Sequence, residues 1–322
     1  MDNKLDSIDF AILGELREDC KLGHKQLADI LGIHHNTVIK RIKKLEDEGV
    51  IKGYGIEADY TKVGYTMPAI VTMRLKKAGI GDEKLLSNEI RNPNIASLFG
   101  VTGINDCISF VRAKDRYDLI NVIQEISKNK KIVKTNTDII MAAHKYPYAF
   151  NPFKKVDFAP RSPGKSRKNY DHVDLMILNE MRKNCKQSSR KLSSKLGIHH
   201  NTITQRIKRL ENDNTILKHR AWIDFRKAGY NLHAIITMKL KKDEFGGPEF
   251  VESMIEIPEV EAFYSTTGLY DCCALVRAKN DDDMLRVLRM IGDVKMVSKT
   301  TTSMILAEYK NQDKFNPLVN IR

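Results

Sequence analysis

Two stretches of the chain carry polar and basic side chains with no acidic residue among them. Each opens with a His-His-Asn-Thr block, at residues 34–37 and again at residues 199–202. On a helix, such side chains can hydrogen-bond to base edges near the N-terminus and neutralise DNA phosphates further along. A solvated basic face is the alternative interpretation, but the recurrence of the whole block favours DNA contact. The candidate DNA-binding residues are His35, Asn36, Thr37, Lys40, Arg41, Lys43 and Lys44 in the first stretch, and His200, Asn201, Thr202, Gln205, Arg206, Lys208 and Arg209 in the second.

The residues of these stretches support metal binding and catalysis less well than they support DNA contact. Adjacent helical residues point about 100° apart, so His34 and His35 cannot chelate an ion from one face, and no cysteine or carboxylate stands at ligand spacing. We expect His34 and His199 to cap the N-termini of their helices instead. No Ser/His/Asp or Cys/His arrangement recurs elsewhere, and no GxxxxGK[ST] loop occurs. We therefore predict no metal, no catalytic residue and no cofactor.

Both stretches belong to copies of one longer unit. The sequence LGIHHNT occurs at residues 31–37 and 196–202, and this offset of 165 holds without a gap over residues 5–152, with 57 identities. A repeat of about 150 residues has the size of a domain or a compact domain pair. Between the copies, residues 154–169 hold two prolines, a glycine and no apolar periodicity, which is typical of a linker.

The first third of each unit predicts three helices. In the first copy, apolar residues recur at helical spacing over residues 8–16, and a second helix over residues 25–31 ends at Gly32. A third helix follows after three or four residues, which completes a helix-turn-helix pattern. The apolar stripe of this third helix consists of Val38, Ile42 and Leu45, and in the second copy of Ile203, Ile207 and Leu210.

The remaining two thirds of each unit predict an α/β module. Strands are expected over residues 69–76, 95–101, 107–113 and 135–141, with helices over residues 83–91 and 115–126. The order βαββαβ is that of a ferredoxin-like sandwich, in which helices cover one face of an antiparallel sheet and the other face needs a partner. The fold class is therefore α+β, and we expect the two copies to pair. The predicted domains are helix-turn-helix domains 1–50 and 170–216, α/β domains 51–153 and 217–322, and the basic linker 154–169.

Charge and hydropathy indicate which partners the chain can bind. The formal net charge is +13, and residues 154–220 alone carry 17 Lys and Arg against 6 Asp and Glu. Such a local excess favours a polyanion. No apolar run approaches the ~18 residues that span a bilayer, so we expect no membrane partner and a cytoplasmic, nucleoid-associated location.

The cysteines suggest a reduced protein. Five cysteines without a CxxC pair fit neither a disulfide framework nor a zinc ribbon. Cys20 and Cys185, beside Lys21 and Lys186, approach the electropositive setting of a redox-sensitive thiol. We expect Cys107, Cys272 and Cys273, on predicted strands, to serve packing, and we do not expect Cys20 and Cys185 to be redox sensors.

A short hairpin between the two middle strands recurs in both copies. It reads TGIND at residues 102–106 and TGLYD at residues 267–271. The simplest interpretation is a tight turn in which glycine supplies a positive φ and aspartate bonds its own backbone.

Taken together, these residues resemble the leucine-responsive/asparagine (Lrp/AsnC) regulators. The resemblance rests on LADILGIHHNTVIKRIKKLEDEGVIKGY at residues 27–54, on Gly64-Tyr65, and on the TGLYD hairpin, and it covers nearly all of the chain except the linker. It implies a winged-type DNA-binding domain and an α/β domain that dimerises and binds small effectors, often amino acids. The chain looks like an archaeal-like tandem fusion of two such regulators. The chain departs from the family's pattern at two positions. Asn105 stands in the first hairpin where the family usually has tyrosine, and Asn214 stands in the second copy where the first copy has Gly49.

The resemblance also implies a function and a second site. We expect a regulator that binds double-stranded DNA, with both recognition helices on one chain as a pseudo-dimer, modulated by an amino acid or another small effector, and assembling further through its α/β domains. The alternatives are an architectural chromatin protein, or an enzyme like the siroheme decarboxylases of the same architecture, whose strand motif and Asn-Leu-Trp segment this chain lacks. The effector site is implied at Gly103, Asp106, Thr135 and Thr137, or at Gly268, Asp271, Thr300 and Thr302.

Overall fold

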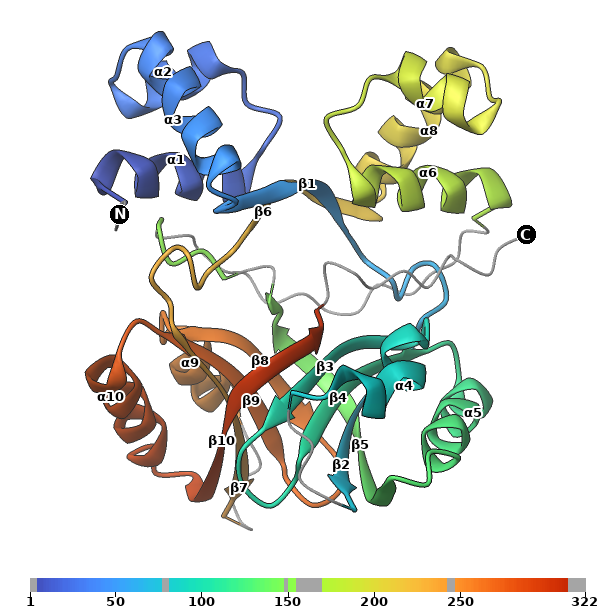
Figure 1. The fold of residues 1–322 in the computed structure, drawn as a ribbon, viewed down its shortest axis with the longest axis vertical. Helices are drawn as coiled ribbons and strands as arrows, with labels where there is room; N and C mark the ends of the chain where they lie inside the picture. Colours follow the sequence, from blue (N-terminus) through green and yellow to red (C-terminus); the bar gives the residue numbers. More distant parts are fainter. Residues whose placement is uncertain (1–4, 77–80, 148–149, 155–169, 242–246, 312–322) are drawn as a thin grey trace.

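The computed structural model describes residues 5–76, 81–147, 150–154, 170–241 and 247–311. Two helical domains lie side by side at one end of the molecule, and an α/β layer forms the other end (Figure 1). The predicted linker lies outside the described residues except for Lys154. Among the helices that the structure describes, none has the length and apolar character that crossing a bilayer requires.

Each helical domain contains the three predicted helices. Asp6 and Asp171 cap the first helix of their copies through reciprocal side-chain to backbone bonds, and Gly32 ends the second helix with φ 64°. The first domain consists of α1 (Ser7–Glu18), α2 (His24–Leu31) and α3 (His35–Asp47), and the second consists of α6 (His172–Lys183), α7 (Ser189–Leu196) and α8 (His200–Asn212).

The turn after the third helix is the same in both copies despite a change of residue. Gly49 has φ 66°, and Asn214, the equivalent residue 165 positions later, has φ 55°. Asparagine tolerates this left-handed region better than other residues with a side chain. The departure from the family pattern at Asn214 therefore leaves the local backbone unchanged.

The strand that follows each third helix pairs with its equivalent in the other copy. Strand β1 (Ile51–Ala58) and strand β6 (Ile216–Ile223) form a two-stranded antiparallel sheet, which we call the ribbon. Gly55 faces Arg220 in this ribbon, and these two residues are themselves equivalent positions of the repeat. They therefore mark the pseudo-two-fold axis that relates the two copies. The helical domains share one hydrophobic core across the ribbon, with residues from both copies.

The α/β domains of the two copies close into one eight-stranded barrel. Its strand order is β10-β3-β4-β2-β5-β8-β9-β7, and every neighbouring pair is antiparallel. The first copy contributes β2 (Met67–Leu75), a 3-10 turn (Glu83–Leu86), α4 (Ser87–Arg91), β3 (Ile95–Val101), β4 (Cys107–Ala113), α5 (Arg116–Ser127) and β5 (Ile132–Lys145). The second contributes β7 (Leu232–Leu240), α9 (Pro248–Ile255), β8 (Val260–Thr266), β9 (Cys272–Ala278), α10 (Asp281–Gly292) and β10 (Val297–Lys310).

The predicted βαββαβ order and α+β class are confirmed, with two corrections to element bounds. The helix predicted over residues 83–91 is a 3-10 turn followed by a single short helix. The last strand, predicted over residues 135–141, extends over 132–145, because its second half leaves β2 and pairs with β8 of the other copy. This exchange joins the copies edge to edge.

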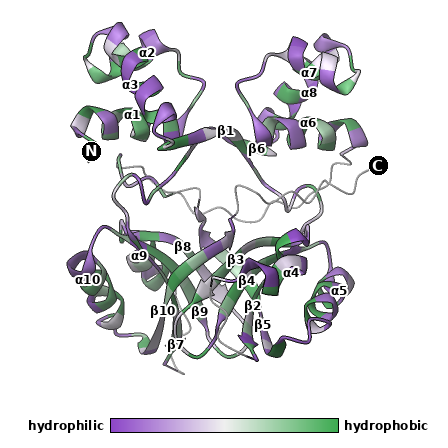
Figure 2. Ribbon diagram, viewed as in Figure 1, coloured by the Kyte–Doolittle hydropathy of each residue, from purple (hydrophilic) through white to green (hydrophobic). Residues whose placement is uncertain are grey.

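Apolar side chains fill the barrel and the space between its strands and the outer helices. Phe99, Phe110, Tyr264 and Leu275, which come from both copies, are buried together inside the barrel. Figure 2 shows hydrophobic residues concentrated in the strands, while the helices carry both kinds of residue, as amphipathic helices do.

Candidate nucleic-acid interface

The recognition helices α3 and α8 begin at a histidine cap, as predicted. Nδ1 of His34 accepts a hydrogen bond from the backbone N–H of Asn36 at 3.2 Å, and Nδ1 of His199 accepts one from Asn201 at 3.4 Å. Each histidine therefore satisfies one of the unpaired N–H groups of the first turn. The second histidine of each pair becomes the first residue of its helix.

Part of the predicted DNA-binding set is exposed on these helices. The side chains at the start of the helix and along one side face solvent, whereas Thr37, Thr202 and His200 are half-buried. An exposed polar set at the N-terminal end of a helix has the geometry that base contact requires. The exposed members of the set are His35, Asn36, Lys40 and Lys43 on α3, and Asn201, Gln205, Lys208 and Arg209 on α8.

Two arginines of the predicted set point to the first helix of their own domain. Arg41 Nη1 lies 2.7 Å from an Asp6 carboxylate oxygen and 3.1 Å from one of Asp9, whose side chain is fully buried. In the second copy, Arg206 pairs in the same way with Asp171 and Asp174.

These ion pairs fasten each recognition helix to the first helix of its domain, α3 to α1 and α8 to α6. The hydrogen bond from Arg206 lowers the pKa of Asp171 to about 2, so this carboxylate stays ionised at neutral pH. Lys44 lies 3.9 Å from Asp9, and Arg209 pairs with Asp174 while remaining exposed. The sequence carried a signal for this role, because both aspartates of the first helix recur in the second copy.

The second helical domain is the more positive of the two. Residues 170–220 hold 11 Lys and Arg against 5 Asp and Glu, whereas residues 5–55 hold 8 against 9. Part of the excess lies on α7, where Arg190 and Lys191 are exposed. The two domains therefore present unequal electrostatic surfaces to a polyanion.

The β3–β4 and β8–β9 hairpins lie against the opposite copy. The backbone N–H of Thr102 donates to the carbonyl of Met304 at 2.9 Å, and the N–H of Thr267 donates to that of Ile139 at 2.9 Å. Both glycines of the hairpins have φ 106°, as the tight-turn interpretation predicts. The predicted self-bonding of the aspartate is wrong, because Asp106 accepts from the backbone N–H of Leu75 on the neighbouring strand at 2.7 Å.

Two of the effector residues implied by the resemblance, Asp106 and Thr135, lie on opposite sides of β2. The backbone N–H of Asp106 donates to the Met73 carbonyl on β2, and Thr135 is paired with Met73 from the other side. One strand therefore separates them, a distance of about 10 Å. The second copy repeats this arrangement with Asp271, Met238 and Thr300.

The two hairpins differ in what faces their glycine. Asp138 of the first copy is buried and accepts a hydrogen bond from the backbone N–H of Leu269 at 3.1 Å. A Cβ at Gly268 would lie 2.1 Å from the Asp138 carboxylate, so only glycine leaves room for it. At the first hairpin the equivalent neighbour is Ser303, whose hydroxyl would lie 3.6 Å from a Cβ on Gly103.

A cavity of about 670 Å³ lies between the ribbon and the barrel. On its wall, Arg277 lies 2.8 Å from Glu261, and His233 lies 2.9 Å from the same carboxylate. Burial raises the pKa of Glu261, but Arg277 and His233 outweigh burial and lower it to about 2. Over the described residues, no group of three His, Cys, Asp or Glu side chains is placed to hold a metal ion.

Comparisons with known proteins agree with this architecture. A family model described as the Lrp/AsnC ligand binding domain matches residues 233–315, and one described as winged helix-turn-helix DNA-binding matches residues 5–52 and 170–216. The HTH-type transcriptional regulator FL11 of Pyrococcus furiosus is 32% identical over 140 residues, which are 44% of this chain and 91% of FL11. The regulator AldR of Mycobacterium tuberculosis is 29% identical over 139 residues, 42% of this chain and 78% of AldR.

A solved structure also matches nearly the whole chain. The siroheme decarboxylase NirDL has a TM-score of 0.62 and covers 95% of this chain and 93% of its own, at 13% sequence identity. At that identity the match concerns the fold alone. The sequence relatives, by contrast, are regulators that each align with about half of this chain. The chain therefore belongs to the Lrp/AsnC family of DNA-binding transcriptional regulators, of which it holds two copies of the helix-turn-helix unit.

Proposed function

We propose that one chain reads both halves of a DNA operator, as a pseudo-dimer with α3 on one half-site and α8 on the other. The ribbon is the observation that carries this proposal. Each recognition helix leads directly into a strand of the ribbon, so the pairing of β1 with β6 couples the positions of the two helices. Regulators that read half-sites one DNA turn apart, ~34 Å, need a fixed spacing of this kind.

The side chains of the ribbon favour pairing between unlike copies. Arg220, which is 1% exposed, lies 3.0 Å from Glu57, which is 5% exposed. The repeat places glycine at the position equivalent to Arg220 and Trp222 at the position equivalent to Glu57. Two second copies would therefore bring two buried arginines together at the axis, and two first copies would bury Glu57 without its partner. Either arrangement loses the buried ion pair between Arg220 and Glu57, which is strongly destabilising.

The steric fit of the ribbon also favours pairing between unlike copies. A Cβ at Gly55 would lie 2.4 Å from the indole nitrogen of Trp222, so the glycine of the first copy makes room for the tryptophan of the second. We infer that the halves of one chain, or of two chains, pair with each other in preference to pairing with themselves.

Within this pseudo-dimer, the exposed polar residues at the start of α3 and α8 contact bases, and the exposed lysines contact phosphates. Arg41 and Arg206 act as positioning residues, because their guanidinium groups are tied to the first helix of their domain. The two surfaces differ, with Lys40 replaced by Gln205. We therefore expect an operator with two unlike half-sites.

Footprinting with the full-length chain tests this proposal. Lys43 and Lys208 are equivalent, exposed, and without an ion pair among those described, so Lys43→Ala and Lys208→Ala form a matched pair of variants. After genomic pull-down has supplied bound fragments, each variant should lose protection over a different half-site. Broad coverage without a motif would indicate an architectural DNA-binding protein, and equal weakening of both half-sites by both variants would refute separate reading.

We further propose that a small effector, such as an amino acid, binds at the β3–β4 and β8–β9 hairpins, and that chains assemble through the α/β domains. The match to a ligand-binding domain supports this for the β8–β9 hairpin, which lies within the matched residues 233–315. The position of both hairpins between the copies extends the proposal to the β3–β4 hairpin. Calorimetric titration with each amino acid, followed by sedimentation of the free and bound protein, tests both statements. An effector that binds the Gly103→Val chain as tightly as the unmodified chain would refute the assignment to the first hairpin.

We infer a regulator rather than an enzyme. The relatives that align in sequence are named as transcriptional regulators. An absorbance scan after addition of siroheme provides the test. We expect no stoichiometric binding spectrum, and tight binding would favour the enzyme class.

A further inference from the structure

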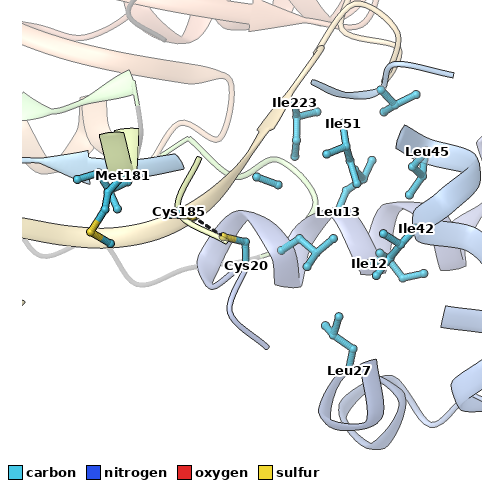
Figure 3. Packing of buried hydrophobic residues seen from close by; sticks show 14 of the residues in the cluster. Ile12, Leu13, Cys20, Leu27, Ile42, Leu45, Ile51, Met181, Cys185 and Ile223 are labelled. Carbon is cyan, nitrogen blue, oxygen red and sulfur yellow. Dashed lines mark hydrogen bonds between the residues drawn. The ribbon is translucent and has the colours of Figure 1, made fainter. Parts of the chain in front are cut away.

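Two thiols from opposite copies meet beside the ribbon. The Sγ atoms of Cys20 and Cys185 lie 3.3 Å apart, and both cysteines are free (Figure 3). Each follows the first helix of its domain, and the two are equivalent positions of the repeat. Their backbones are fixed to the ribbon, because the N–H of Cys20 donates to the carbonyl of His219 at 2.9 Å and the N–H of Cys185 donates to that of Tyr54 at 3.1 Å.

The surroundings of the two thiols are unequal. His219 lies beside Cys185, and its Nε2 is 2.8 Å from a carboxylate oxygen of Glu211. The equivalent residue in the other copy is Tyr54, which carries no base and donates its hydroxyl to Glu46.

This asymmetry separates the acidities of the two thiols. The hydrogen bond from Cys20, together with His219 and the nearby Lys21, lowers the pKa of Cys185, and the contact between the two thiols raises the pKa of Cys20. Cys185 is thus the thiol that is available as a thiolate, and Cys20 keeps its proton. An attacking thiolate next to a second thiol that can resolve the product is the arrangement of redox-active cysteine pairs.

We propose that Cys20 and Cys185 are a redox-active pair that a small hydroperoxide converts into a disulfide joining the two halves of the chain. The Cys185 thiolate attacks one peroxide oxygen, the O–O bond breaks, and the other oxygen leaves as an alcohol or water after taking up a proton. Cys185 is then a sulfenic acid. The Cys20 sulfur attacks the Cys185 sulfur, the S–O bond breaks, and water leaves with the Cys20 proton. One peroxide is reduced by two electrons as two thiols become one disulfide.

The geometry requires only a small movement for this step. A disulfide needs its sulfur atoms at about 2.05 Å, so the two Sγ atoms must approach by a little more than 1 Å, about the reach of a χ1 adjustment. Redox activity at Cys20 and Cys185 differs from the expectation drawn from the sequence. The sequence analysis named both cysteines but not the contact between them, since a contact between equivalent positions leaves no local signal.

The other cysteines provide an internal control. Cys107 and Cys272 lie on barrel strands, and burial raises the pKa of each thiol to about 12. Cys273 is 1% exposed, and burial raises the pKa of its thiol as well. Cys185, at 6%, is the most exposed of the five. A small oxidant should therefore modify the proposed pair before the strand cysteines.

Mass spectrometry of the full-length protein tests the proposal, which does not depend on the proposed function. The reduced chain is treated with hydrogen peroxide, its remaining thiols are alkylated, and it is digested with trypsin. We expect residues 18–21 and 184–186 to appear as one disulfide-linked peptide, with the three strand cysteines alkylated. Oxidation of the strand cysteines without this peptide, or no oxidation at all, would overturn the proposal.

Variants separate the roles of the two thiols. Cys20→Ser should trap a sulfenic acid on Cys185 that dimedone labels, whereas Cys185→Ser should give neither label nor disulfide. His219→Phe should slow oxidation at pH 7 severalfold, because loss of the imidazole raises the pKa of Cys185 and so lowers its thiolate fraction. Tyr54→Phe, the matched control, should leave the rate unchanged. Dimedone labelling of Cys185 in the Cys20→Ser chain keeps the test decisive if His219→Phe folds poorly, and labelling of Cys20 alone would reverse the assigned roles.

Discussion

Replacing Arg220 by methionine should destabilise the whole molecule through one buried charge. Methionine keeps most of the volume of the arginine stem but removes the charge that lies 3.0 Å from the buried Glu57 carboxylate. Removing one partner of a buried ion pair costs ~3–5 kcal/mol, because the charge that stays buried loses a close opposite charge. We expect the free energy of unfolding of Arg220→Met to fall by this amount.

Urea unfolding followed by tryptophan fluorescence is the appropriate assay. The chain has one tryptophan, Trp222, and it lies in the ribbon itself, two residues from the substitution. A double variant, Glu57→Leu with Arg220→Met, removes both charges and should recover most of the loss. Lys218→Met is the control, because Lys218 lies on the same strand and its ion pair with Glu18 is one-third exposed.

The size of the effect decides whether the ribbon specifies pairing. An exposed ion pair contributes ~0–1 kcal/mol, so Lys218→Met should change stability by no more than that. If Arg220→Met costs as little as this control, or if the double variant is as unstable as the single one, the argument that Glu57 and Arg220 select unlike copies fails.

Three further predictions concern the hairpins, DNA and pH. Gly268→Ala should cost ~1–2 kcal/mol more in urea unfolding than Gly103→Ala, since both glycines have φ 106° but only the first substitution meets a carboxylate, at 2.1 Å. Lys43→Ala should reduce the slope of log K against log salt by about one while leaving the unfolding free energy unchanged. Burial lowers the pKa of Lys145 and Lys310 to about 8. Between pH 8 and about 10.4, the unfolded chain therefore holds protons that the folded chain has lost. The free energy of unfolding, measured against a Lys145→Met chain, should rise with pH in that range by up to ~3 kcal/mol.

Local patterns accounted for the helical domains, since apolar periodicity, a glycine at the end of the second helix and a repeated capping block all act within a few residues. The ribbon and the extension of β5 toward β8 were not predicted, because both depend on contacts between residues more than a hundred positions apart. A strand that leaves one neighbour for another shows no change of alternation in its sequence.

In the candidate DNA interface, too, local features were predicted and contacts between separate elements were not. The helix that carries the basic residues was predicted, but Arg41 could not be separated from Lys40 by helical spacing alone. The difference arises from Asp9, on another helix, which holds Arg41 inward. Ion pairs to a neighbouring helix are therefore the part of an interface that the pattern of a single helix does not reveal.

The opposition of Gly55 and Arg220 at the axis has an evolutionary consequence. In a symmetric homodimer every substitution is made twice, so a residue on the axis always faces itself, and a charged side chain there meets its own like charge. Joining two copies in one chain removes this constraint, because one copy can gain an arginine while the other keeps a glycine. Duplication followed by fusion thus opened axial positions to selection, and the two halves could specialise without losing each other as partners.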